Sequence, residues 1–271
     1  MSIILIDGSY YMFYRYYAIL SWWKRAHPDE PIDDPITCKA FVSTFRSTFL
    51  KNIEKFKKTH QLNDTNSKII IAKDCHQKDI WRQNHTTEYK TNRDYSNFKG
   101  GPFFKMAYDE LFQASGGKIV SHPHLEADDC IACLVNQYKS FHENIYILAN
   151  DHDYMQLIDS NVHVYNLQGK SLREHKAFYG SAEKALFMKI ILGDKSDNIP
   201  PVFSKCGAKT AEKYYENNTM FLKKLESDSD AKTRLETNRM LIDFSNIPKK
   251  YHIEFISKHY YICPKYWSFK L

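Results

Sequence analysis

The sequence predicts an α/β protein in which a mostly parallel sheet flanked by helices is followed by a small helical domain. Short, continuously apolar runs rich in β-branched residues alternate with long helical patterns, which is typical of parallel strands buried on both faces. From residue 181 onward, helical patterns follow one another without a convincing strand. We therefore expect an α/β domain at residues 1–180 and a helical domain at residues 181–271.

Each element is expected from its own pattern. Apolar, β-rich runs predict strands at residues 2–7, 67–74, 117–121, 144–151 and 162–166. Helical periodicity is found at residues 36–59, 126–141, 181–192, 208–217 and 231–244. The segment after Trp81 is rich in Asn, Tyr and basic residues and is broken by Gly100, Gly101 and Pro102, which is typical of a surface loop. Beyond about residue 245 we expect aromatic residues of the tail to pack onto the core.

Composition narrows the class of protein. The chain has 271 residues, is 43% hydrophobic and 26% charged, and so resembles an ordinary globular protein. Its net charge of +6 favours a polyanionic partner. No apolar run approaches the roughly 18 residues of a membrane span, and Asp7 comes too early for a signal peptide. Six cysteines without regular spacing indicate reduced thiols, hence an intracellular protein, expected to be monomeric.

One pair of cysteines, Cys130 and Cys133, forms a CxxC motif just after His122 and His124. A zinc site would require a second ligand pair at a defined spacing and less apolar surroundings. We therefore interpret these cysteines as buried helix residues.

Three acids, Glu126, Asp128 and Asp129, crowd the start of an apolar helix. One carboxylate at a helix N-terminus stabilises it by roughly 0.3–1 kcal/mol. Adjacent like charges at about 4 Å instead repel by roughly 1–4 kcal/mol. Helix capping alone therefore does not explain three acids in this place.

Further acids follow the predicted strands. Asp7, Asp74, and the pair Asp151 and Asp153 come at or directly after strand ends, where ligands bind in open α/β sheets. If these loops converge with the helix start and with the "GDKSDNIP" loop, one crevice holds nine acids: Asp7, Asp74, Glu126, Asp128, Asp129, Asp151, Asp153, Asp194 and Asp197.

So many carboxylates in one place require cations. Hard oxygen ligands favour Mg²⁺, with Mn²⁺ as a substitute, and two such ions roughly 3.5–4 Å apart can clamp both oxygens of an in-line phosphoryl displacement. Aspartyl-phosphate phosphatases also begin with a strand that ends in Asp. They have a second Asp two residues later, where this chain has Ser9. That difference argues against a phosphatase.

Over residues 3–217 the chain resembles the structure-specific 5′ nucleases, the family of flap endonucleases and of phage and bacterial-polymerase-type 5′-3′ exonucleases. "LIDGS" is similar to the opening Asp-Gly motif of that family, and "WRQNHTTEYKTNRD" is similar to its "FR…YKxNR" segment. "LEADD", "ANDHDYMQLI" and "GDKSDNIP" are similar to three further blocks, in the family's order.

The resemblance implies a PIN-like fold and a ligand set for each of two Mg²⁺ ions. The first set is Asp7, Asp74, Glu126, Asp128 and Asp129, and the second is Asp151, Asp153, Asp194 and Asp197. It also implies a helical arch over the site at about residues 82–121. In this arch Lys90 and Arg93 would be catalytic, Tyr89 would stack on an unpaired base, and Arg82 would contact the substrate.

The resemblance also implies a helix-three-turn-helix in the second domain. Gly207, Lys209 and Thr210 would contact a phosphate of the duplex through a helix start. Here "PVFSKCGAKTA" is one residue longer than the family's turn and lacks two of its glycines. A K⁺ site at this turn is an expectation that the altered sequence leaves open.

The expected function is metal-dependent cleavage of branched or 5′-tailed DNA near a junction of single strand and duplex, in DNA replication or repair. Two alternatives stay open at this point. A related PIN-like ribonuclease would use the same acids on RNA or on an RNA/DNA hybrid. A catalytically inactive DNA-binding scaffold would not require every acid, and all are present.

Overall fold

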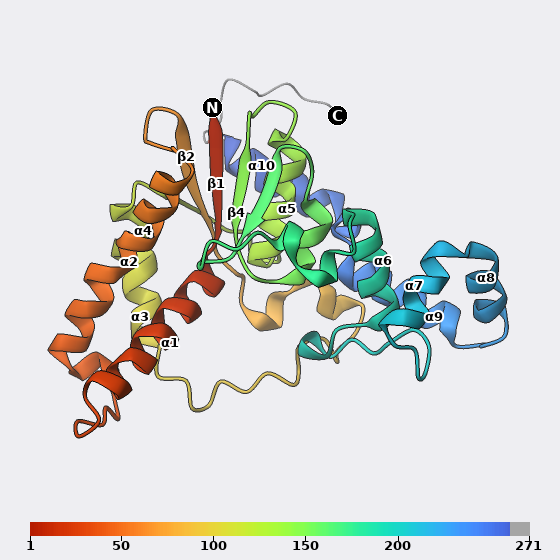
Figure 1. Ribbon diagram of the computed structural model, residues 1–271, viewed down its shortest axis with the longest axis horizontal. Coiled ribbons are helices and arrows are strands. Elements are labelled where there is room, and N and C mark those ends of the chain that lie inside the picture. The colour runs from red at the N-terminus through yellow and green to blue at the C-terminus, as the bar shows by residue number, and fades with distance from the viewer. Residues whose placement is uncertain (261–271) are drawn as a thin grey trace.

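The central sheet of the computed structural model, which describes residues 1–260, has five parallel strands in the order β3-β2-β1-β4-β5 (Figure 1). The strands are β1 Ser2–Asp7, β2 Ser67–Ala72, β3 Lys118–Val120, β4 Ile145–Leu148 and β5 Val162–Tyr165. All five expected strands are therefore confirmed. The chain passes from β1 to β2 on one side and later to β4 on the other, so the carboxyl end of β1 lies at a topological switch point.

Successive side chains of β1 point to opposite faces of the sheet. Both faces carry apolar side chains, and a layer of helices covers each of them. Ile4 and Ile6 face one layer, whereas Ile3 and Leu5 face the other. The first layer is formed by α1 Gly8–Ala26, α2 Lys39–Thr59, α3 Gly101–Met106 and α4 Phe112–Ala114, and the second by α5 Ala127–Tyr138 and α10 Lys249–Lys258. Within α2 a stripe of aromatic side chains, including Phe41, Phe45 and Phe49, is fully buried.

The helical part of the chain has its own core. Its helices are α6 Ala182–Leu192, α7 Ala208–Glu216, α8 Asn218–Glu226 and α9 Ala231–Ile242, which confirms the three patterns expected there and adds α8. Ile191, Phe203 and Ala211 are buried in this second core. None of the helices within residues 1–260 is both long and apolar enough to cross a membrane.

The chain does not stay in the helical part to its end. After α9 it returns to the α/β part, where Phe244, Ile247 and Phe255 belong to the same core as α5 and the sheet. Beyond residue 245 the expected packing onto the core is found for Phe255, whereas Tyr260 is 52% exposed. The aromatic residues of the last stretch, 261–271, lie outside the described residues.

The expected helical arch differs from prediction. Residues 85–100 have no helix and form a strap of irregular chain that runs from the helical part to α1 and α3 (Figure 1). The helical turns that follow, from α3 through a π-helical turn at Ala107–Leu111 to α4, are packed in the first layer, with Phe103 and Phe112 fully buried. Turn-forming Asn, Asp, Ser and Gly residues of the strap explain its lack of helix.

Two glycines position the loops of the site. A Cβ on Gly8, at the start of α1, would lie 2.7 Å from the backbone oxygen of Ala72 in β2. Gly193, after α6, has φ +69°, and a Cβ there would lie 2.4 Å from the oxygen of Ile199. Glycine thus allows α1 to begin against β2, and allows the chain to turn sharply into the loop of Asp194 and Asp197.

Candidate metal centre

A cavity of about 530 Å³ opens at the carboxyl ends of the strands. Five of the nine expected acids line it, and so do two basic side chains of the strap, Lys90 and Arg93. The five acids are Asp7, Asp74, Glu126, Asp128 and Asp151. The crevice predicted from the strand ends is therefore present. Lys90 and Arg93 of the strap are the basic residues in its lining.

The first acids come from three different elements. Asp7 ends β1 and caps α1, because its Oδ1 accepts a hydrogen bond from the Tyr10 N–H at 2.9 Å, while its Oδ2 accepts one from the Tyr154 hydroxyl at 2.8 Å. Asp74 follows β2, and its Oδ1 accepts a hydrogen bond from the Ala127 N–H at the start of α5 at 2.7 Å. Ser9, the residue that argued against a phosphatase, donates to the other oxygen of Asp74.

These acids share a low tendency to ionise. Burial raises the pKa of Asp7 to about 7, with a further contribution from the charge of Asp74. Burial also raises the pKa of Asp74 and of Asp128, and for Asp128 the neighbouring charges of Asp129 and Glu126 add to it. Within residues 1–260 no Lys or Arg nitrogen lies within 4.0 Å of Asp7, Asp74 or Asp128.

The two other acids at the start of α5, Glu126 and Asp129, have cationic partners. Both oxygens of Asp129 accept hydrogen bonds from the Arg82 guanidinium, at 2.7 and 2.8 Å, and one also accepts from the Trp81 indole at 2.8 Å. Arg82 also donates to Glu126 at 3.0 Å and to the Leu241 carbonyl oxygen at 2.7 Å. Asp129 is 0% and Arg82 1% exposed.

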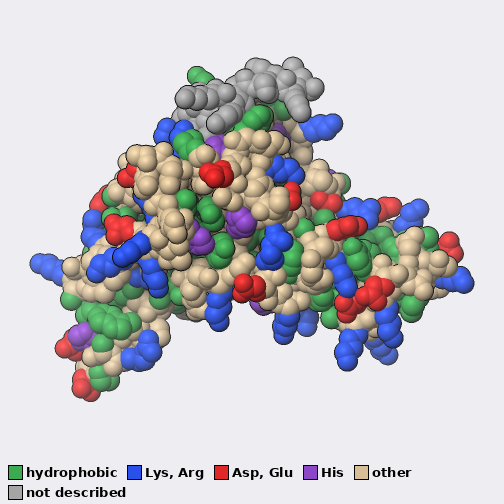
Figure 2. Space-filling model, turned by 45° about the horizontal axis from the view of Figure 1, so that its top comes forward, with side chains coloured by type: hydrophobic (Ala, Val, Ile, Leu, Met, Phe, Trp, Pro, Cys, Tyr) green, Lys and Arg blue, Asp and Glu red, His purple; other side chains and the backbone are tan. Residues whose placement is uncertain are grey.

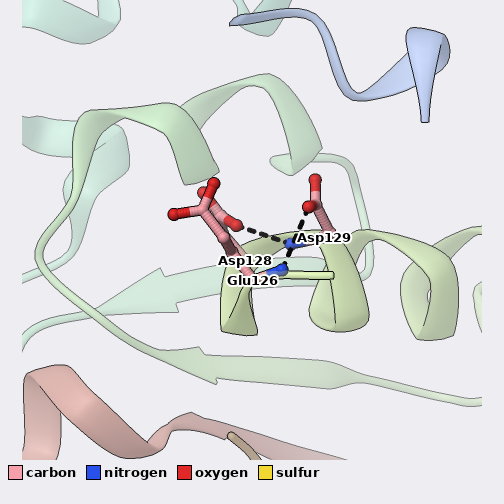
Figure 3. Close-up of side chains that lie close together, drawn as sticks. All are labelled: Glu126, Asp128 and Asp129. Carbon is pink, nitrogen blue, oxygen red and sulfur yellow. Dashed lines mark hydrogen bonds between the residues drawn. The ribbon is translucent and has the colours of Figure 1, made fainter. Parts of the chain in front are cut away.

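This geometry corrects one expectation. Arg82 was expected to contact the substrate, but its side chain is enclosed by protein and joins the helical turn Trp81–Asn84 to α5 and to the end of α9. The carboxylate of Asp129 lies close enough to those of Glu126 and Asp128 to share a metal ion with them, and it also accepts a hydrogen bond from the Glu126 N–H at 3.1 Å (Figure 3).

The strap contributes a second buried cation. Lys90 has φ +59°, and its backbone N–H donates to the Asp197 carbonyl oxygen at 3.0 Å. Its ammonium donates to Glu126 Oε1 and lies 3.5 Å from Asp197 Oδ2. Although burial of Glu126 opposes it, the charges of Lys90 and Arg82 keep the pKa of this carboxyl below its usual value. Arg93 donates to Asp197 Oδ1 at 2.6 Å.

Tyr89, beside Lys90, also corrects an expectation. Its ring is 2% exposed, and its hydroxyl donates to Glu126 Oε2 at 3.0 Å. A ring enclosed in this way presents no face to an unpaired base. Tyr89 therefore acts in this structure as a buried hydrogen-bond donor to the acids.

The second set of acids surrounds a lysine that sequence reasoning missed. The Lys189 ammonium of α6 lies 2.8 Å from Asp194 Oδ2 and 3.5 Å from Asp151 Oδ1, and it also contacts Asp153. Despite burial, Lys189 lowers the pKa of Asp194 to about 2, whereas burial raises that of Asp153 to about 7. The only sequence signal was a lysine between Met188 and Ile190 within an apolar helix.

The two sets therefore differ in how well they suit a divalent cation. Asp7, Asp74 and Asp128 are half-buried carboxylates at the cavity, without a Lys or Arg nitrogen within 4.0 Å in residues 1–260, and such oxygen donors suit Mg²⁺ or Mn²⁺. Asp153, Asp194 and Asp197 also approach one another closely enough to hold an ion. Their charges, however, already face Lys189, Arg93 and Lys90.

The residues expected to hold the duplex lie outside the cavity. Gly207 precedes α7, and Lys209 and Thr210 are in its first turn. Gly207 has φ −95°, and a Cβ there would meet nothing within 4 Å, so the fold itself does not require glycine at this position. Figure 2 shows Lys and Arg side chains along the lower edge of this helical end, interspersed with acids.

An α/β sheet whose switch point carries several carboxylates suited to divalent ions is the arrangement of a metal-dependent hydrolase site. Residues 2–185 match the family model described as "5'-3' exonuclease, N-terminal resolvase-like domain". The chain belongs to this family of 5′-3′ exonucleases.

Curated relatives agree with this assignment. A 5'-3' exonuclease of Buchnera aphidicola subsp. Acyrthosiphon pisum is 31% identical over 217 residues, which cover 77% of this chain and 68% of the relative. A protein of Enterobacteria phage T4 named Ribonuclease H is 29% identical over 233 residues, covering 78% of this chain and 75% of that protein.

Solved structures share the fold. The T5 D15 protein co-crystallised with metal ions has a TM-score of 0.67 at 17% identity, covering 97% of this chain and 100% of that one. A T5 D15 flap endonuclease variant described as a pseudo-enzyme-product complex with DNA and metal ions has a TM-score of 0.66, also at 17% identity, covering 97% of this chain and 99% of that one.

Proposed function

We propose that this protein is a divalent-metal-dependent 5′ nuclease that hydrolyses phosphodiester bonds of DNA near a junction of single strand and duplex. The observation that carries the proposal is the group of three acids in the cavity wall, Asp7, Asp74 and Asp128, which come from separate elements and face no Lys or Arg nitrogen within 4.0 Å in residues 1–260. Family membership and the T5 structure with DNA support the same substrate class.

We assign the ligands of the two ions from the contacts that each acid makes. Asp7, Asp74 and Asp128 hold a first Mg²⁺, with Glu126 at its border, and Asp151, Asp153, Asp194 and Asp197 are the candidates for a second. We assign Asp129 a positioning role, because Arg82 and Trp81 already engage its oxygens. The bound ions would supply a polarised phosphate and an activated water for in-line attack.

The residues of the chain hold the substrate. Lys90 and Arg93 line the cavity, and we assign them the scissile phosphate, whose negative charge they offset as it develops. In the helical part, the open space around Gly207 allows a phosphate of the duplex to approach the start of α7, with Lys209 as a point charge. Such contacts recognise the shape of the DNA and not its sequence. A K⁺ ion at the altered turn stays a proposal.

End-labelled substrates test this function. We expect Mg²⁺-dependent cleavage of a 5′-flap and of a nicked duplex near the junction, abolished by EDTA, with Mn²⁺ able to replace Mg²⁺. Absence of cleavage with either ion, while the protein still binds the flap in Ca²⁺, would instead indicate an inactive DNA-binding scaffold.

A second candidate substrate is the RNA strand of an RNA/DNA hybrid, because the phage T4 relative is named Ribonuclease H. The acids of the cavity do not discriminate between sugars by themselves. Matched 5′ flaps of DNA, of RNA and with an RNA end on a DNA template separate the two, since faster cleavage of the ribose-containing strand would identify primer removal.

A further inference from the structure

One wall of the cavity is aromatic. Tyr10 and Phe13 of α1 line it together with Tyr95 of the strap and Phe104 of α3. Phe13 is stacked with Tyr95, with ring centroids 6.3 Å apart and planes inclined by 19°. It is also stacked with Tyr17, one helical turn further along α1, at 6.4 Å and 11°. Phe13 is thus the shared ring of two nearly parallel pairs.

The outer members of these pairs are unusually open to solvent. Tyr17 is 52% and Tyr95 47% exposed, although both are large rings beside a well-packed aromatic cluster. Core packing does not explain these exposed faces, because Tyr16, the chain neighbour of Tyr17, is 3% exposed and supplies the core contact of this part of α1. Exposed rings in nearly parallel planes are the arrangement on which unpaired bases stack.

The aromatic row also leads out of the cavity. Tyr17 borders a neighbouring hollow of about 250 Å³ that Lys24 and Lys99 line together with Asp33. Lys99 donates to the backbone carbonyl oxygen of Asp33, so its charge is held at this rim. The two lysines outnumber the single acid, which suits a chain that carries one phosphate per nucleotide.

We propose that Phe13, Tyr17 and Tyr95 form a stacking surface for unpaired nucleotides of the 5′ strand, which leaves the metal centre along α1. This inference rests on the proposed nuclease function and adds a subsite to it. The surface takes the place of Tyr89, which is buried, as the partner of unpaired bases. Stacking of this kind tolerates any base, because every base has a π-face.

Tyr17 is the position to test, because it lies outside the lining of the metal centre, whereas Tyr95 is close to Arg93. We expect Tyr17→Ala to weaken binding of a long 5′-flap substrate in Ca²⁺ by about fivefold or more. Binding of a nicked duplex without a flap should stay unchanged. Tyr17→Phe should bind like the wild type, because stacking requires the ring and not the hydroxyl.

Two further measurements sharpen the experiment. 2-Aminopurine placed in the flap should be quenched on binding by the wild type and by Tyr17→Phe, and should recover with Tyr17→Ala. Trp22→Ala is the matched control: Trp22 is 43% exposed on the same helix but packs beside Trp23 and His27. This control should behave like the wild type in both assays.

The outcomes separate this inference from the proposed function. If Tyr17→Ala loses affinity equally for flapped and flapless DNA, or if 2-aminopurine fluorescence is the same with both Tyr17 variants, the stacking surface is wrong while the nuclease function stands. If the wild type binds neither substrate, the proposed function itself fails, and the exposed rings would have to serve a protein partner instead.

Discussion

The Lys90 ammonium is hydrogen-bonded to Glu126, so the irregular strap and the start of α5 meet at one ion pair in the wall of the cavity. Lys90 is 7% and Glu126 5% exposed, and the left-handed backbone of Lys90 is fixed by its N–H bond to Asp197. An ion pair enclosed to this degree holds the strap against both sets of acids.

Removing this ammonium should impair the chemical step more than binding. We expect Lys90→Met, which removes the ammonium but keeps a side chain of similar length, to slow single-turnover cleavage at saturating enzyme by about 10²–10³-fold. Affinity in Ca²⁺ should change only a few-fold. Lys78→Met, an exposed lysine outside the lining of the cavity, is the control for general charge. A rate for Lys90→Met within about threefold of the wild type would exclude a catalytic role.

Asp128→Asn should abolish cleavage without harming the metal-free fold. Asp128 is repelled by Asp129 and Glu126, so its neutral amide should leave the melting temperature in EDTA unchanged or higher. The rise in melting temperature that Mg²⁺ gives the wild type should be lost. Glu183→Gln, an acid in the first turn of α6, is the control for a simple helix-dipole effect. A clear destabilisation of Asp128→Asn in EDTA would show that this carboxylate is a structural partner.

Lys189 should compete with a cation for the second set of acids. Replacing it by Met removes the ammonium from Asp151, Asp153 and Asp194, so these carboxylates should bind Mn²⁺ more tightly, by about tenfold or more. Calorimetric titration with Mn²⁺ measures both binding steps, and Lys195→Met in the neighbouring loop is the control. Unchanged or weaker binding in the second step would mean that Lys189 does not occupy the ion's place.

Arg82 should contribute to stability and not directly to substrate binding. Arg82→Met leaves Asp129, Glu126 and the Leu241 carbonyl without their buried partner, which we expect to cost about 3–5 kcal/mol in urea unfolding. The double variant with Asp129→Leu should recover part of this loss, since it removes the unpaired charge. If the Arg82→Met protein is as stable as the wild type but binds DNA in Ca²⁺ more weakly, Arg82 contacts the DNA directly.

Local patterns in the sequence predicted the strands and the acids at their ends. Buried parallel strands are continuously apolar, and a carboxylate at the end of such a run is visible in a few residues, as at Asp7. The partners of these acids were not predictable in this way. Arg82 meets Asp129 from 47 positions away, and Tyr89 meets Glu126 from 37, so their burial depends on how the strap folds back.

Lys189 illustrates the same limit. Its helix is apolar on several sides, so helical periodicity alone does not show which side chain turns toward the loop of Asp194. The arch was expected as a helix from the resemblance, whereas the turn-forming residues of 91–100 already indicated irregular chain.

The return of the chain to the sheet has a mechanical consequence. The chain enters the helical part before α6 and leaves it after α9 to pack α10 on α5, and Ile80 and Tyr89 also lie in the helical core. The helical part is therefore connected to the α/β part at more than one place, so it cannot rotate freely as it would on a single linker. A fragment cut at residue 180 would lack Phe255, which is 0% exposed, and would uncover apolar surface of α5. The two parts should consequently melt in one cooperative transition.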